Sequence, residues 1–336
     1  MKMSAQQAKE FASDQEIRWC PGCGDYAILK SLQKMFAEVN SDTANTVFVS
    51  GIGCAARLPY YMSTYGFHTI HGRAPAIATG LKLANPNLDV WVISGDGDGL
   101  SIGGNHLLHL IRRNVDLQFL LFNNEIYGLT KGQYSPTSRM GTRSPSTPNG
   151  SVDRPLSAAS VALAAGARFL AQGIDSLQRP LISIFKRAQC HKGTSFIQIF
   201  QNCIVYNDGI FNNFTSKENA SDNQIFLEHN KPLVFGVDKN KGLYFNPKKL
   251  KLEVAIIGKN NISLKNILIH DESNRNLALL LAEMDGSELP VAIGVLYCNP
   301  TQIFTKQPSK EIKSTTPHSL EKLNKFIRRG HTWSVD

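Results

Sequence analysis

The sequence has no apolar run long enough to span a bilayer as a helix. Its opening residues, MKMSAQQAKEFASDQEI, also lack the apolar centre of a signal peptide. Hydrophobic residues make up 42% of the 336-residue chain, an ordinary share for a globular protein. We therefore expect a cytoplasmic protein that makes no membrane contact and folds as one large domain with a smaller appendage.

Clusters of Lys and Arg with interleaved aromatic residues are missing, and no motif of a nucleic-acid-binding module is present. The formal net charge is nonetheless +9, with an isoelectric point near 9.2. This balance favours an anionic partner, and without a nucleic-acid motif we expect acidic small molecules or an acidic protein. Much of the basic excess follows Lys231, where a solvated surface position is the simplest explanation of any single lysine.

The six cysteines of a chain with cytoplasmic features do not predict a disulfide framework. Cys20-x-x-Cys23 could be a thiol–disulfide pair, half of a zinc site or half of an iron–sulfur site. The motif precedes the first expected strand, unlike a thioredoxin motif, and a second pair at zinc-finger spacing is missing. We expect Cys190 and Cys298 to be ordinary packed or free thiols.

Strand-like and helix-like segments alternate from residue 25 to residue 203, which is typical of an α/β protein with a doubly wound parallel sheet. The amino-acid composition changes after Asp208, where a polar, Asn-rich segment precedes expected short strands and Lys-rich turns. The sequence therefore predicts a ligand-binding domain over residues 1–210 and a smaller extension of mixed structure over residues 211–336.

Two buried strands with polar ends organise this domain. Val90–Ile93 leads into the glycine-rich segment GDGDG, a helical pattern follows from Ser101, and the strand Leu117–Phe122 ends at Asn123-Asn124. If the two strands are neighbours, Asp96 and Asn124 share the edge of the sheet where α/β proteins bind ligands. Glycine N–H groups, a helix N-terminus, a carboxylate and an amide oxygen together suit a Mg²⁺–diphosphate.

The GDG segment alone has a simpler explanation as a strand-to-helix turn in which Asp96 caps the helix. Its pairing with Asn124, about one βα unit later, resembles the thiamin-diphosphate motif and favours cofactor binding. Cys54 follows another expected strand in the loop GIGC, and Cys203 follows a strand that should end on the same edge. With Cys20 and Cys23 they make four candidate neighbours, as a [4Fe–4S] cluster requires.

Six segments, taken together, resemble one family: WCPGCGDYAIL, GIGCAAR, HGRAPAIATG, SGDGDGLSIGGNH, NNEIYGLTKGQYSPTS and QNCIVYNDG. They resemble the β subunits of the 2-oxoacid:ferredoxin oxidoreductases, most closely the 2-oxoglutarate (2-oxoglutarate synthase) branch. The match runs in order over about residues 15–210, and KPLVFGVDKNKG extends it loosely into the tail. The resemblance implies a thiamin-diphosphate-binding fold.

The resemblance also implies roles for individual residues. The cluster ligands would be Cys20, Cys23, Cys54 and Cys203, and the Mg²⁺ ligands would be the Asp96 and Asn124 side chains and the Ile126 carbonyl. The residues lining thiamin diphosphate would be Gly53, Cys54, His71, Gly97, Asp98, Gly128 and Leu129. Lys131 would lie on a loop over the substrate pocket, and Arg57 would contact the distal carboxylate of 2-oxoglutarate.

The expected reaction is oxidative decarboxylation of 2-oxoglutarate to succinyl-CoA and CO₂, with electrons passed through the cluster to ferredoxin. The family places the pyrimidine-binding domain in an α subunit, so we expect activity only in an αβ or (αβ)₂ assembly. Pyruvate or another 2-oxoacid could be the substrate instead. Two further alternatives are a non-redox, two-chain thiamin-diphosphate decarboxylase, which does not need four thiolates, and a non-catalytic zinc or nucleic-acid-binding module.

Overall fold

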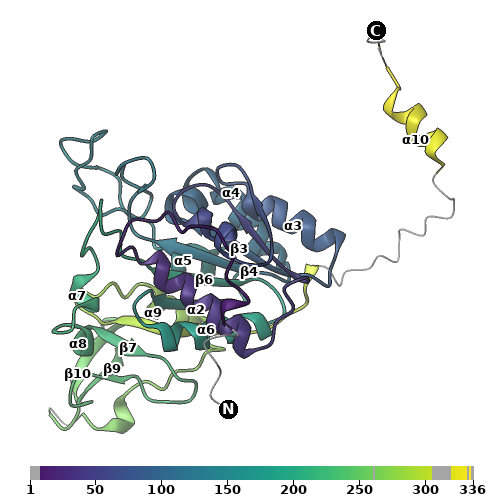
Figure 1. Ribbon diagram of the computed structural model, residues 1–336. Coiled ribbons are helices and arrows are strands. Elements are labelled where there is room, and N and C mark those ends of the chain that lie inside the picture. Colours follow the sequence, from purple (N-terminus) through teal and green to yellow (C-terminus); the bar gives the residue numbers. More distant parts are fainter. Residues whose placement is uncertain (1–7, 260–261, 305–318, 331–332, 334–336) are drawn as a thin grey trace. The chain divides into compact units, whose positions relative to one another are not determined.

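The computed structural model describes residues 8–259, 262–304, 319–330 and 333 (Figure 1). The chain divides into two compact units, residues 1–305 and 306–336, and the second contains helix α10 (Leu320–Ile327). Among the described residues, every helix is too short or too polar to cross a membrane. The expectation that the chain has no signal peptide rests on its first 17 residues. Of these, residues 1–7 lie outside the described part of the chain.

The first unit is built on an eight-stranded sheet in the order β2-β1-β3-β4-β6-β5-β11-β7. The strands from β2 to β5 in this order are parallel, β11 is antiparallel to β5, and β7 is parallel to β11. This arrangement confirms the α/β fold predicted from the sequence. The strands are β1 (Thr46–Ser50), β2 (Tyr65–His68), β3 (Asp89–Gly95), β4 (Gln118–Asn123), β5 (Phe169–Ile174), β6 (Ser195–Phe200), β7 (Gln224–Phe226) and β11 (Val291–Cys298).

Helices cover both faces of this sheet because the central strands are apolar on both faces. Along β3, Val90 and Val92 pack on one face while Trp91 and Ile93 pack on the other, and all four are fully buried. One face carries α3 (Ala74–Ala84), α4 (Gly104–Arg113), α5 (Ala158–Ala164) and α9 (Arg275–Ala282). The other carries α2 (Asp25–Glu38), η1 (Ala55–Tyr61) and α6 (Gln178–Cys190).

The boundary expected near residue 210 does not separate two cores, because β7 and β11 complete the larger sheet. Only the segment between them forms a small antiparallel sheet of its own, in the order β10-β9-β8. Its strands and the neighbouring short helices are β8 (Val234–Phe235), β9 (Lys241–Asn246), β10 (Lys251–Ile256), α7 (Asn212–Thr215), α8 (Ala220–Asn223) and η3 (Leu264–Asn266). The strands β11 and β7 of the extension therefore continue the main sheet beyond β5.

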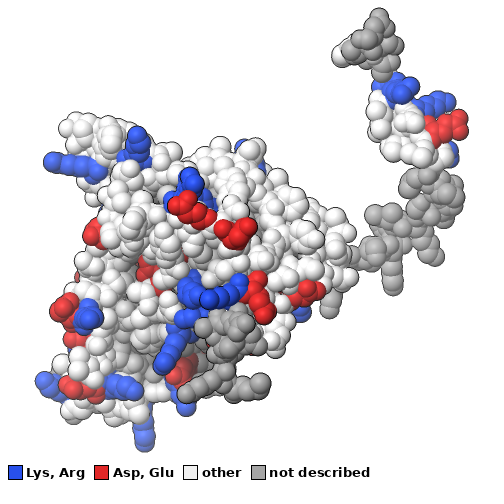
Figure 2. All heavy atoms as spheres, viewed as in Figure 1, with Lys and Arg blue, Asp and Glu red and all other residues white. Residues whose placement is uncertain are grey.

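Charged side chains on the face drawn in Figure 2 are interspersed, with Lys and Arg lying beside Asp and Glu. The ion pairs Lys186–Glu38 and Arg187–Glu272 show the same mixing at the level of single contacts. The basic residues described on this face therefore lie among acidic ones rather than in a single basic patch.

Candidate active site

Asp96 follows β3 directly and is buried, with 2% of its surface exposed. The hydroxyl groups of Ser135 and Thr137 donate to its Oδ2 atom at 2.5 and 2.6 Å. Burial raises the pKa of Asp96, and these hydroxyl groups offset part of that rise. Both of these partners are neutral, so a bound cation would supply the positive charge that a buried carboxylate requires.

Asn124 lies at the end of the neighbouring strand β4, as the sequence predicts. Its Oδ1 atom accepts the backbone N–H of Ile126 at 3.2 Å, and its Nδ2 donates to Gln201 Oε1 at 2.8 Å. The next residue back, Asn123, accepts the Thr137 hydroxyl at 2.9 Å. Thr137 thus joins the ends of β3 and β4 into one hydrogen-bonded edge with oxygen atoms suited to a hard cation.

Gly97 permits a close contact that no other residue type would allow. A Cβ atom built at this position would lie 2.3 Å from the ring of Tyr127. The Tyr127 hydroxyl donates to the Gly97 carbonyl at 2.9 Å, so the glycine-rich turn and the loop after β4 are in direct contact. The segment GDGDG is therefore more than a helix cap: it is packed against the loop that carries Ile126 and Gly128.

Asp98 points into the protein and connects three loops. Its carboxylate accepts the backbone N–H groups of Ile52 at 3.2 Å and Gly72 at 2.7 Å, and the Ser94 hydroxyl at 2.6 Å. His71 Nδ1 lies 2.7 Å from the same carboxylate, while 43% of its side chain remains exposed. Asp98 therefore positions His71 and the Gly53 loop, and this role was not foreseen from the sequence.

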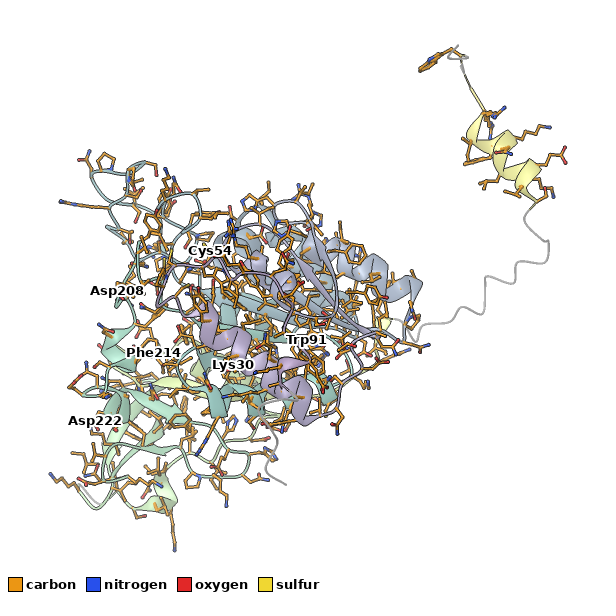
Figure 3. The ribbon with its side chains drawn as sticks, viewed as in Figure 1. Lys30, Cys54, Trp91, Asp208, Phe214 and Asp222 are labelled. Atoms are coloured by element: carbon orange, nitrogen blue, oxygen red, sulfur yellow. The ribbon has the colours of Figure 1, made fainter. Side chains whose placement is uncertain are left out.

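The four cysteines that the sequence singles out line a single cavity of about 170 Å³: Cys20, Cys23, Cys54 and Cys203. Asn124, Gly128 and Leu129 line the same cavity. A Cβ atom built on Gly128 would lie 3.5 Å from Cys203 Sγ and 3.7 Å from Cys54 Sγ, so the Gly128 backbone faces both thiols. Cys54, labelled in Figure 3, comes from the loop between β1 and η1.

Burial affects the protonation of three of these thiols, those of Cys23, Cys54 and Cys203. It raises the pKa of Cys54 to about 12 and raises the pKa values of Cys23 and Cys203 as well. The thiolate form of these three residues is therefore disfavoured in the free chain. Positive metal charge would favour the thiolates.

Within residues 8–259, 262–304, 319–330 and 333, no three His, Cys, Asp or Glu side chains converge closely enough to hold one metal ion. The cysteine cavity therefore lacks the closed tetrahedral geometry of a structural zinc site.

Asp25 is the main residue that the sequence analysis missed. It is 1% exposed, neither carboxylate oxygen has a hydrogen-bond partner in the described part of the chain, and it lies on the wall of the cysteine cavity. Burial, with a smaller contribution from Asp175, raises its pKa to about 7. Its position immediately after CPGCG was the signal in the sequence that could have identified it.

The sequence analysis also missed Ser135, Thr137 and Gln201. Gln201 Nε2 lies 3.2 Å from Cys23 Sγ.

The two expected substrate residues lie in different settings. Arg57 lines the cysteine cavity and a neighbouring cavity of about 450 Å³ that also includes Gly53 and Leu129. Its Nη1 atom donates to the Arg18 carbonyl at 3.0 Å. Lys131 is exposed on a tight turn with a positive φ of 77° and does not line either of these cavities.

Comparison with known proteins points to one family. Residues 45–199 match the family model for the C-terminal TPP-binding domain of thiamine pyrophosphate enzymes. The chain is 43% identical to the 2-oxoglutarate oxidoreductase subunit KorB of Mycobacterium tuberculosis, over 98% of this chain and 89% of that protein. It is 42% identical to the 2-oxoglutarate synthase subunit KorB of Methanothermobacter thermautotrophicus, over 56% of this chain and 66% of that one.

A solved structure agrees with these relatives. The 2-oxoglutarate:ferredoxin oxidoreductase of Magnetococcus marinus, determined with 2-oxoglutarate, coenzyme A and succinyl-CoA bound, superposes with a TM-score of 0.74 at 32% identity. The alignment covers 97% of this chain and 96% of that chain. The predicted thiamin-diphosphate-binding fold is therefore confirmed.

Proposed function

This chain belongs to the β subunits of the 2-oxoacid:ferredoxin oxidoreductases, and on that premise we propose that it carries the diphosphate-binding and electron-transfer part of a 2-oxoglutarate oxidoreductase. The proposed reaction is the CoA-dependent oxidative decarboxylation of 2-oxoglutarate. One observation supports it above the others: Asn124, at the edge beside Asp96, also lines the cavity of the four cysteines. A cofactor held at this edge would lie next to the electron carrier.

The diphosphate of thiamin diphosphate would bind through Mg²⁺ to Asp96, Asn124 and the carbonyl of Ile126. The fit rests on a buried carboxylate with two neutral hydroxyl partners and on the closely packed glycine at position 97. When bound, this cofactor supplies the electron sink for loss of CO₂ from a 2-oxoacid. The chain contributes orientation: Asp98 holds His71 and the Ile52–Gly53 loop in place.

The cysteine cavity would hold a [4Fe–4S] cluster. Such a cluster uses a separate iron for each of four thiolates, so it does not require three ligands to converge on one ion. That donor set consists of Cys20 and Cys23 in the turn before α2, Cys54 after β1 and Cys203 after β6. Cys203 is buried, Cys23 and Cys54 are partly buried, and Cys20 is exposed. Gln201 contributes a hydrogen-bond donor 3.2 Å from Cys23 Sγ, a contact that would tune the potential of a bound cluster.

Arg57 would bind the distal carboxylate of 2-oxoglutarate. It lies between the cysteine cavity and the cavity lined by Gly53, and its guanidinium uses one N–H for the Arg18 carbonyl. The remaining N–H groups can form a charge-assisted pair with a carboxylate. Pyruvate lacks this second carboxylate, so an Arg57-dependent preference would distinguish the two substrates. Lys131, on the turn after Leu129, lines neither cavity, so it would contact the substrate only in a pocket formed together with an α subunit.

The test is anaerobic co-expression with the partner α-subunit gene, followed by iron analysis and CoA-dependent dye reduction. We expect a brown protein with about four irons per chain, and faster turnover of 2-oxoglutarate than of pyruvate. Arg57→Gln should raise the KM for 2-oxoglutarate at least ~10-fold, whereas Arg113→Gln, on the exposed end of α4, should not.

Cys203→Ser should abolish iron binding, and Cys298→Ser should preserve it, because Cys298 does not line the cysteine cavity. A colourless, iron-free preparation that still decarboxylates 2-oxoacids would favour the non-redox alternative. Faster turnover of pyruvate would contradict the role given to Arg57.

A further inference from the structure

Gln201, the residue directly after β6, contacts both halves of the proposed site. It is buried, with 1% of its surface exposed, and it lies on the wall of the cysteine cavity. Its Oε1 atom accepts a hydrogen bond from Asn124 Nδ2 at 2.8 Å, and its Nε2 atom lies 3.2 Å from Cys23 Sγ. One side-chain amide therefore joins the strand end that would hold the cation to a cysteine that would hold the cluster.

The backbone carbonyl of Asn202 fixes which way the Gln201 amide points. A carbonyl oxygen can only accept a hydrogen bond, so the atom 2.7 Å from it is the Nε2 donor of Gln201. The Oε1 atom then faces Asn124, and because it can only accept, Asn124 presents its Nδ2 donor. The Asn124 Oδ1 atom is left on the side of the Ile126 N–H, at 3.2 Å. Gln201 thus determines that the oxygen of Asn124, rather than its nitrogen, is available to a cation.

Backbone contacts hold this amide in place at both ends. The N–H of Gln201 donates to the carbonyl of Asn123, at the end of β4, at 2.9 Å. The Asn202 carbonyl that orients the amide also accepts the N–H of Gly24 at 3.2 Å, in the turn that carries the first two cysteines. These contacts oppose rotation of the Gln201 amide, so a change at Asn124 is passed on rather than absorbed.

Hydrogen-bonded amides polarise one another inside a protein. A cation at the Asn124 Oδ1 atom would draw electrons from that amide and make its Nδ2–H group a stronger donor to Gln201. The polarised Gln201 amide would in turn donate more strongly to Cys23 Sγ. A stronger donor to a ligating sulfur stabilises the electron-rich, reduced form of a cluster and raises its reduction potential.

We propose that Gln201 is a positioning residue that couples the two halves of the site, so that a cation at Asn124 makes a cluster at Cys23 easier to reduce. By linkage, the reduced protein binds the cation more tightly by the same factor. The protein would then accept electrons most readily when the cofactor that delivers them is in place. The coupling rests on the proposed function, since it requires both the Mg²⁺–diphosphate and the cluster.

The test uses the complex of this chain with its α subunit, purified anaerobically and freed of Mg²⁺ and thiamin diphosphate. A redox titration followed by electron paramagnetic resonance gives the midpoint potential of the cluster, with and without Mg²⁺–thiamin diphosphate, for the wild type and for Gln201→Met. The bound charges act through space in both proteins, so the difference between the two shifts isolates the hydrogen-bonded path.

We expect the shift on cofactor binding to be more positive in the wild type than in Gln201→Met. The difference should be at least ~3-fold in the reduction equilibrium, which is about 28 mV at roughly 59 mV per tenfold change. Gln201→Glu separates the two contacts, because its carboxyl group still accepts Asn124 Nδ2 but has no N–H for Cys23. This variant should keep most of the affinity for Mg²⁺–thiamin diphosphate, measured by calorimetry, and still lose the positive part of the shift. It also serves as the test should Gln201→Met fail to fold.

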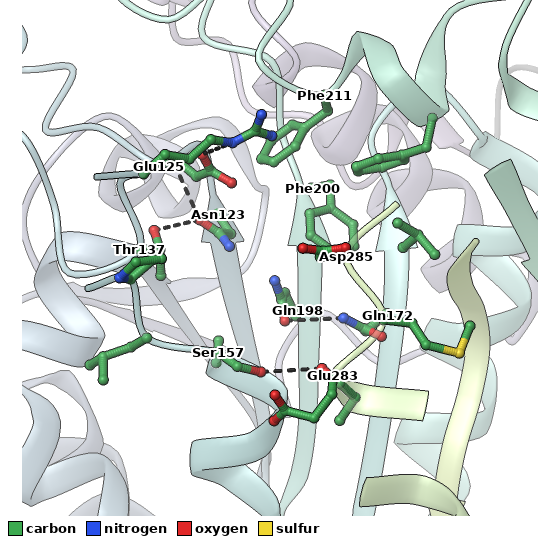
Figure 4. A pocket seen from close by; sticks show the side chains of 18 of the residues that line it. Asn123, Glu125, Thr137, Ser157, Gln172, Gln198, Phe200, Phe211, Glu283 and Asp285 are labelled. Carbon is green, nitrogen blue, oxygen red and sulfur yellow. Dashed lines mark hydrogen bonds and ion pairs between the residues drawn. The ribbon is translucent and has the colours of Figure 1, made fainter. Parts of the chain in front are cut away.

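Gln198→Met is the matched control variant. Gln198 lies on β6 itself, is 5% exposed and is hydrogen-bonded to Gln172, but it points into a different cavity (Figure 4) and does not line the cysteine cavity. It should retain the wild-type shift. The coupling is overturned if either Gln201 variant keeps the full shift, or if Gln198→Met loses it to the same extent. A wild-type complex that binds no iron would overturn the proposed function as well.

Discussion

His191 is a buried histidine without hydrogen bonds: it is 6% exposed, and neither ring nitrogen has a partner among the described residues. Burial lowers its pKa from the ordinary value of 6.5 to about 4. The unfolded chain therefore takes up the proton first as the pH falls. The stabilisation that neutral His191 provides is present above about pH 6.5 and is lost as the pH falls toward 4, by up to roughly 3 kcal/mol.

We expect His191→Phe to reduce this loss of stability in acid. Phe169 contacts the His191 ring with 5.3 Å between centroids and a 42° tilt between the ring planes, so an aromatic replacement retains that contact. Thermal unfolding of the wild type and the variant between pH 7.5 and 4.5 provides the measurement. His106→Phe, at a partly exposed position on α4, is the control. Parallel pH curves for His191→Phe and the wild type would contradict the assignment.

At the residue scale, the sequence predicts those side chains whose chemistry is visible in short motifs. Cys54 and Cys203 were predicted to be neighbours because both follow strands that end at one edge of the sheet, and the structure brings them to one cavity. Asp25 and Gln172 escaped notice because burial without a hydrogen-bond partner depends on residues that are distant in the chain. The inward orientation of Asp98 was missed for the same reason, because its partners Ile52 and Gly72 are distant in the chain.

The contact between the His71–Gly72 turn and the start of α4 gives a prediction at the level of elements. Gly72 has a φ of 70°, and a Cβ atom there would lie 2.5 Å from the backbone nitrogen of Gly103. Gly72→Ala thus combines a left-handed conformation with a backbone clash, and we expect it to lower the free energy of unfolding by roughly 2–4 kcal/mol. Denaturant unfolding measures this change, and weaker cofactor binding should accompany it because Gly72 donates to Asp98.

Gly166→Ala separates the two contributions. Gly166 also has a positive φ, of 91°, but a Cβ atom there would meet nothing within 4 Å. This variant should lose only the conformational part, roughly 1 kcal/mol. Equal losses for the two variants would show that the close approach of the turn to Gly103 contributes nothing.

The sequence located most elements correctly but not their partners. The strand expected at Leu117–Phe122 is β4 (Gln118–Asn123), and the helix expected from Ser101 begins as an irregular turn at Asp98 before α4. Apolar periodicity indicates such segments locally. The pairing of β5 with β11 joins residues more than a hundred positions apart, and local patterns carry no information about such a contact.

For the whole molecule, the relatives are subunits of 2-oxoacid oxidoreductases, and we propose that this chain provides one half of a shared active site. Arg57 and Leu129 lie on the walls of open cavities, and Lys131 is exposed beside them. These positions are consistent with a pocket that an α subunit completes. The chain alone should therefore bind the cluster without turning over substrate.

The formal charge of +9 gives a final prediction, about electron transfer in the assembled enzyme. Because basic and acidic residues are interspersed on the face in Figure 2, attraction of an acidic ferredoxin would come from the net charge, which salt screens. We expect the KM for ferredoxin to rise at least ~5-fold between 50 and 300 mM NaCl, and that for the cationic dye methyl viologen not to rise. Lys248→Gln with Lys251→Gln, two exposed tail lysines, should raise the ferredoxin KM at low salt. An unchanged KM across this range would mean that ferredoxin docks through uncharged contacts.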